Sequence, residues 1–144
     1  MPSPELDNLV KIGSLKREAG AQDEFDGLMD SARARLTDSK KEELALESRF
    51  DLAYNASHAI ALSALRWHGY RSTNRYIVFQ ALSHTLGLEP SLWRVMASAH
   101  AIRNSGEYEG VLEVDAQLVT DLVASAEIAY SATKSLGLLK PDKR

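Results

Sequence analysis

The stretch from Ser48 to Gly69 constrains the fold most, because apolar side chains surround nearly the whole circumference when it is read as a helix. Helical spacing over roughly 20 residues makes a helix about 30 Å long. A helix that is apolar on most sides must lie between neighbours. We therefore expect this segment to be the central helix of a bundle, with its many alanines allowing the neighbouring helices to approach closely.

Other segments show the same helical spacing, and no alternating pattern is long enough to predict a strand. Proline near the first turn and glycine after the last turn mark several helix boundaries, and Asn74 is an expected N-cap. Gly106 is expected to break or end the helix that begins near Pro90, before an acidic turn over 107–115. We expect the remaining helices at 4–12, 22–37, 75–86, 90–105 and after residue 115. The prediction is an all-α fold, an antiparallel bundle of four to five helices.

Length and charge indicate one soluble domain with little attraction for polyanions. The 144 residues carry a net charge of −3, so nucleic acid could be held only through a local basic patch. We expect an N-terminal helix or extension over 1–20, the helical bundle over 21–137 and a frayed polar tail over 138–144. No secretory signal or membrane-spanning run is predicted, which favours a cytoplasmic protein without membrane contact.

The chain has no cysteine, which excludes a disulfide scaffold, a thiolate metal site and a cysteine nucleophile. The spacing of the four histidines and the carboxylates does not favour a metal site either. We therefore expect no bound metal and no cofactor. His68 and His84 stand near expected helix C-termini, where partial positive charge is favourable, so neither is assigned a catalytic role.

A polar stripe interrupts the apolar central segment at Asp51, Asn55, His58 and Arg66. These spacings are expected to keep the four side chains on one helical face. The stripe could be the solvent side of the helix, which is common. Because the rest of the helix is so apolar, the stripe could instead face a cleft or a subunit interface.

A second group of polar residues surrounds Arg103. His100 lies one helical turn before it and Asn104 directly after it, and Glu107 and Tyr108 follow. The planar guanidinium of arginine can make bidentate hydrogen bonds to phosphate. The alternative is a structural role, in which Arg103 pairs with Glu107 and Tyr108 caps the core. Spacing alone does not choose between the two.

The two groups together resemble the HEPN domain superfamily (higher eukaryotes and prokaryotes nucleotide-binding). The similar parts are the run 49–59 with the alanine-rich stretch after it, and Arg103-Asn104 with Glu107-Tyr108 before a final amphipathic helix. The resemblance covers about 25–136. It implies a four- or five-helix bundle that forms a symmetric homodimer, in which the motif arginines of both chains line a shared cleft. Many members are metal-independent ribonucleases that use an arginine followed four to six residues later by a histidine.

This chain departs from that motif, because no histidine occurs after His100. The candidate positions hold Tyr108, Glu109 and Gly110 instead. A tyrosine with an ordinary pKa near 10 transfers protons poorly at neutral pH. The sequence thus resembles branches of the superfamily in which standard nuclease activity is not expected.

We therefore expect a domain that binds RNA, a nucleotide or another phosphate-bearing ligand through an arginine-centred cleft at a dimer interface. The expected ligand-binding residues are Arg103, Asn104, Glu107, Tyr108, Asp51, Asn55 and His58. One alternative is a metal-independent, toxin-type endoribonuclease that uses Arg103 with His100 or His58 for proton transfer. Another is a protein-interaction module of a toxin–antitoxin-like pair, bound to a nucleotidyltransferase-like partner.

Overall fold

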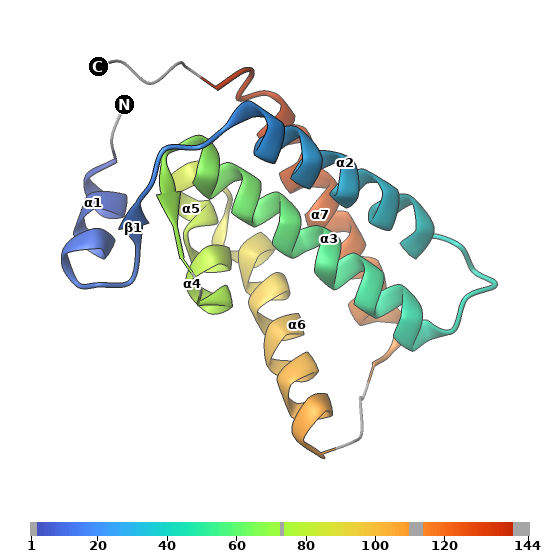
Figure 1. Cartoon of the computed structure of the whole chain (residues 1–144). Coiled ribbons are helices and arrows are strands. Elements are labelled where there is room, and N and C mark those ends of the chain that lie inside the picture. The colour runs from blue at the N-terminus through green and yellow to red at the C-terminus, as the bar shows by residue number, and fades with distance from the viewer. Residues whose placement is uncertain (1–2, 73, 110–113, 140–144) are drawn as a thin grey trace.

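The computed structural model describes residues 3–72, 74–109 and 114–139, and of residues 106–109 only the backbone. These residues are mostly helical, which confirms the predicted all-α class (Figure 1). Two short strands, which the sequence did not predict, pair antiparallel with Lys16 opposite Arg71. The elements in chain order are α1 (Pro4–Lys11), β1 (Lys16–Arg17), α2 (Gln22–Ser39), α3 (Leu46–Trp67), β2 (Tyr70–Arg71), α4 (Arg75–Gln80), α5 (Leu82–Thr85), α6 (Pro90–Glu109) and α7 (Ala116–Lys134).

Helix α3 is the central helix, as its apolar circumference predicts. Helices α2, α4, α5, α6 and α7 all pack against it. In Figure 1, α2 and α6 run in the opposite direction to α3 and α7. Phe50, Tyr54, Ile60 and Leu65 of α3 are completely buried among these helices. None of the described helices is long and apolar enough to cross a membrane.

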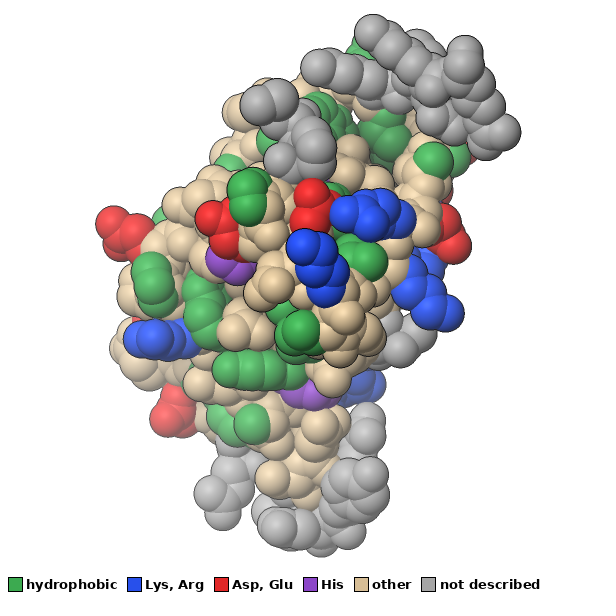
Figure 2. All heavy atoms as spheres, turned by 90° about the vertical axis from the view of Figure 1, so that its left-hand side faces the viewer, with side chains coloured by type: hydrophobic (Ala, Val, Ile, Leu, Met, Phe, Trp, Pro, Cys, Tyr) green, Lys and Arg blue, Asp and Glu red, His purple; other side chains and the backbone are tan. Residues whose placement is uncertain are grey.

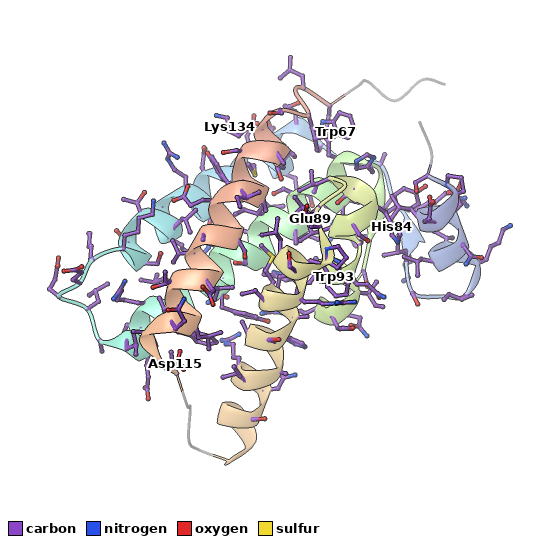
Figure 3. The ribbon with its side chains drawn as sticks, turned by 180° about the vertical axis from the view of Figure 1, so that it is seen from behind. Trp67, His84, Glu89, Trp93, Asp115 and Lys134 are labelled. Atoms are coloured by element: carbon purple, nitrogen blue, oxygen red, sulfur yellow. The ribbon has the colours of Figure 1, made fainter. Side chains whose placement is uncertain are left out.

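Side-chain caps fix the starts of α4 and α7. Asn74 Oδ1 accepts a hydrogen bond from Ile77 N (3.2 Å) at the start of α4, as the sequence predicts. Asp115 Oδ1 accepts one from Leu118 N (2.7 Å) at the start of α7. Figure 3, which views the molecule from behind, shows Asp115 and Lys134 at opposite ends of α7. This places the acidic cap at the positive end of the helix and the lysine at its negative end.

Two predicted boundaries differ from the structure. The helix expected over 75–86 is divided at Ala81 into α4 and α5. Gly106 does not end α6, which continues to Glu109. A glycine inside a helix lowers its stability by only about 1 kcal/mol relative to alanine. The helical turn that follows Gly106 can offset this cost. The expected acidic turn over 107–115 therefore begins later, and residues 110–113 lie outside the described residues.

The N-terminal segment is part of the core. Leu6 of α1 is completely buried and Leu15 is 3% exposed, and both belong to the main hydrophobic cluster. At the other end, Trp67 Nε1 donates to Gly137 O (3.1 Å) and Leu139 N donates to Gln22 Oε1 (2.9 Å). Of the expected polar tail, residues 140–144 lie outside the described residues.

Two glycines give a matched pair of stability predictions. A Cβ atom at Gly20 would lie 2.5 Å from the backbone oxygen of Arg66, whereas one at Gly27, inside α2, would meet nothing within 4 Å. We expect Gly20→Ala to destabilise the protein by about 1–3 kcal/mol through steric overlap. Gly27→Ala is expected to stabilise it by about 0.5–1 kcal/mol, because alanine loses less backbone entropy in a helix. Urea unfolding of both variants measures this difference, and equal free energies of unfolding would contradict the close packing at Gly20.

Candidate functional site

The two groups of polar residues singled out in the sequence meet where α3 packs beside α6. Arg103 Nε lies 3.3 Å from Asp51 Oδ1, which joins the C-terminal half of α6 to the N-terminal half of α3. The Arg103 guanidinium also lies over the ring of Tyr54, with Cζ 5.1 Å from the ring centroid. The Arg103 side chain is 29% exposed and that of Asp51 is 55% exposed. Arg103 therefore contacts Asp51 and Tyr54 and is still reachable from solvent.

The completely buried Tyr54 connects three helices. Its Oη lies 2.9 Å from Nδ1 of His100, on α6, and accepts a hydrogen bond from Nη1 of Arg75 (3.1 Å), on α4. Nε2 of His100 lies 3.3 Å from the amide nitrogen of Asn104. A continuous chain of polar contacts thus runs from Arg75 through Tyr54 and His100 to Asn104. The Nδ2 group of Asn104 can only donate, so Nε2 of His100 accepts from it, and Nδ1 of His100 then donates to Oη of Tyr54.

His58 lies on the same side of α3 as Tyr54. Its half-buried imidazole packs edge-on against Phe79 of α4, with ring centroids 6.0 Å apart. Burial, together with the positive charges of Arg75, His100 and Arg103, lowers the pKa of His58 to about 4. The imidazole is therefore neutral at neutral pH.

We use the name Tyr54 cluster for the polar residues that these contacts bring together. Its members are Asp51, Tyr54, His58, Arg75, His100, Arg103 and Asn104. The named members include two guanidinium groups and one carboxylate, that of Asp51, so their permanent charges sum to a positive value. Guanidinium groups at a partly water-excluded position suit phosphate oxygens, because they offer several N–H donors in a fixed plane.

The predicted ligand-binding residues do not all join this cluster. The Nδ2 of Asn55 donates to the backbone oxygen of Asp51 (2.9 Å), so this amide is bound to its own helix. The backbones of Glu107 and Tyr108 belong to α6, and their side chains lie outside the described residues, as does the alternative ion pair of Arg103 with Glu107. The prediction that Arg66 shares the face of His58 is wrong. Eight residues at 3.6 per turn rotate Arg66 about 80° away from His58.

Arg66 instead serves the N-terminal part of the chain. Its side chain is 4% exposed and forms ion pairs with Glu24 (2.9 Å) and Glu18 (3.2 Å). Of the two histidines near helix ends, His68 places Nε2 2.9 Å from the backbone oxygen of Thr85, and His84 is exposed on α5. In the described part of the chain, the contacts of Arg66 and His68 thus lie outside the Tyr54 cluster, and His84 is not among its members.

Sequence reasoning missed Tyr54 and Arg75. Tyr54 follows Asp51 by three positions and precedes His58 by four, which puts all three on one face of the helix. Arg75 directly follows the N-cap Asn74, but its contact with Tyr54 depends on how α4 packs beside α3. No local pattern gives that packing.

Figure 2 shows the face at the left of Figure 1, on which acidic and basic side chains are interspersed. Within the described residues, no group of three or more histidine and acidic side chains could hold a metal ion. Comparison with models of known protein families gives no match to the chain, and comparison with curated proteins gives none either. The chemistry of the Tyr54 cluster is therefore the basis for assigning a function.

Proposed function

We propose that the protein binds a phosphate-bearing ligand, RNA or a nucleotide, through the Tyr54 cluster, with Arg103 as the residue that contacts phosphate. The observation that carries the proposal is the position of Arg103, which is 29% exposed and fixed between the Asp51 carboxylate and the Tyr54 ring. A guanidinium held in this way loses little side-chain entropy when an anion binds.

The ion pair with Asp51 does not prevent binding. An exposed pair such as this one contributes about 1 kcal/mol or less, because solvent screens both charges. A phosphate that makes bidentate hydrogen bonds can replace the carboxylate, which then returns to water. Asn104, next to Arg103 on α6, supplies a further polar group at the edge of the site. We assign Glu107 and Tyr108 to its rim.

The resemblance to the HEPN superfamily adds a homodimer and a protein partner to this proposal. Two copies of the chain would form a homodimer and place their Arg103 side chains in a shared cleft. A nucleotidyltransferase-like protein is the proposed partner of such a dimer. Analytical ultracentrifugation of the purified chain tests the dimer directly.

Binding is favoured over RNA cleavage by the state of the two candidate histidines. Both ring nitrogens of His100 lie within hydrogen-bond distance of Tyr54 and Asn104, so proton transfer to a substrate would have to break this chain of contacts. His58, with its pKa lowered to about 4, holds no proton to donate at neutral pH and is a weak base. Metal-independent cleavage of RNA that depends on Arg103 and on one of these histidines would establish the endoribonuclease alternative instead.

Replacing Arg103 with alanine is expected to weaken binding of a short oligoadenylate RNA at least tenfold, because a charge-assisted bidentate contact is lost. Fluorescence anisotropy of the labelled RNA measures the dissociation constant. Arg94→Ala is the matched control, since Arg94 is exposed nine residues earlier on the same helix and its guanidinium lies over Trp93. Unchanged binding by a folded Arg103→Ala protein would refute the site.

A further inference from the structure

Arg75 stands out among the charged residues near the site. It is half-buried, and its described contacts are the Tyr54 hydroxyl at 3.1 Å and the Tyr54 ring, with Cζ 5.7 Å from the centroid. Within the described part of the chain, no carboxylate lies at ion-pair distance from Arg75. A half-buried cation whose described contacts are with a neutral phenol is unfavourable unless an anion joins it.

We infer that Arg75 is the second cation of the proposed site, and that it contacts from α4 the same phosphate group that Arg103 contacts from α6. The inference rests on the proposed function and deepens it by naming the class of phosphate. The guanidinium carbons of Arg75 and Arg103 lie 5.7 Å and 5.1 Å from the centroid of the Tyr54 ring, so Tyr54 is a common neighbour of the two cations.

The charges favour a terminal phosphate over an internal phosphodiester. A phosphodiester carries one negative charge, whereas a terminal phosphate carries between one and two at neutral pH, its second pKa being about 6. Arg75 has no carboxylate partner among the described residues, and a phosphate with two negative charges offers oxygens to both guanidinium groups. A nucleoside monophosphate, or an RNA end that carries a phosphate, supplies both charges in one group.

His58 gives a spectroscopic readout. Burial is the largest cause of its lowered pKa, and the positive field of Arg75, His100 and Arg103 lowers the pKa in the same direction. These three residues face His58 from α4 and α6, and Asp51 is the acidic member of the cluster on its own helix. A bound dianion would cancel part of this field and raise the pKa of His58. Removing the charge of Arg75 would raise it too, even without ligand.

The test uses the full chain with three probes: adenosine 5′-monophosphate, adenylyl-3′,5′-adenosine, which has only an internal phosphodiester, and adenosine. Isothermal titration calorimetry gives the affinities, and proton NMR follows the His58 ring against pH. We expect the wild-type protein to bind the monophosphate at least tenfold more tightly than the dinucleotide, with a raised His58 pKa in the complex. Arg75→Gln is expected to lose at least tenfold in monophosphate affinity and most of this preference.

Arg75→Lys keeps the charge but loses the planar donor pair, so it should retain an intermediate affinity and serves as the second variant if Arg75→Gln does not fold. Arg94→Gln is the control for the loss of one positive charge from the surface. Arg103→Ala could lose binding while the Arg75 variants keep the wild-type affinity and the preference for the monophosphate over the dinucleotide. That result would overturn the role of Arg75 and leave the proposed function intact. Wild-type binding in both sets of variants would overturn the proposed function itself.

Discussion

Replacement of Arg66 by alanine is expected to destabilise the protein by about 3–5 kcal/mol, because it removes a buried guanidinium that links two partly exposed carboxylates and three backbone carbonyls. The guanidinium pairs with the Glu24 carboxylate through Nε (2.9 Å) and with Glu18 Oε2 through Nη2 (3.2 Å). Its remaining N–H groups donate to the backbone oxygens of Glu18 (2.7 Å), Ala19 (2.9 Å) and Tyr70 (3.2 Å). One side chain of α3 thus holds the segment after β1, the start of α2 and β2 together.

Alanine would leave buried carbonyl oxygens without donors, and each such group costs about 1–3 kcal/mol. Arg66→Lys is expected to lose most of the same stability, since an ammonium group is too compact to reach both carboxylates and the three carbonyls. Arg35→Ala, an exposed arginine of α2, is the control and should change the free energy of unfolding by no more than about 0.5 kcal/mol. Urea unfolding of the three variants provides the measurement. A loss below about 1 kcal/mol for Arg66→Ala would show that solvent replaces these hydrogen bonds.

The helices could be predicted from the sequence because their signals are local. The N-cap Asn74, the proline at the start of α6 and the apolar spacing of α3 all act within a few residues of the element that they define. Gly106 was expected to break or end α6 but lies inside it, because the helical turns on both sides outweigh the small destabilisation that a glycine causes in a helix. Local signals of this kind give the elements but not the side on which each one packs.

The site could be predicted only in part for the same reason. Asp51, His58, Arg103 and Asn104 carry recognisable polar chemistry, and the structure brings them together with His100. The roles of other residues depend on partners that are distant in the sequence. Arg75 meets Tyr54 across 21 residues, and Arg66 meets Glu24 across 42. No periodicity links such pairs, so Arg66 was placed on the wrong face and Arg75 was overlooked.

Acidification from pH 7 to pH 5 is expected to remove about 2 kcal/mol of stability through His58 alone. The pKa of His58 is about 4 in the folded protein and near 6.5 in the unfolded chain. Between these values the unfolded chain binds a proton that the folded protein does not bind, so the free energy of unfolding falls as the pH decreases from about 6.5 toward 4. Burial also lowers the pKa of His68, which acts in the same direction.

Carboxylates with lowered pKa values, such as Asp7 and Glu18, also stabilise the folded protein. This stabilisation is lost only at lower pH, because these groups keep their charge until the pH falls below the ordinary carboxyl range. A comparison of pH 7 with pH 5 therefore isolates the histidines. His58→Gln should remove the greater part of the pH dependence in urea unfolding, whereas His84→Gln, at an exposed position on α5, is the matched control and should retain it. An NMR titration of His58 that gives a pKa near 6.5, together with unaltered pH dependence in His58→Gln, would contradict the burial of this imidazole among the cations of the Tyr54 cluster. A low pKa that rises when adenosine 5′-monophosphate binds would place the ligand's charge next to His58.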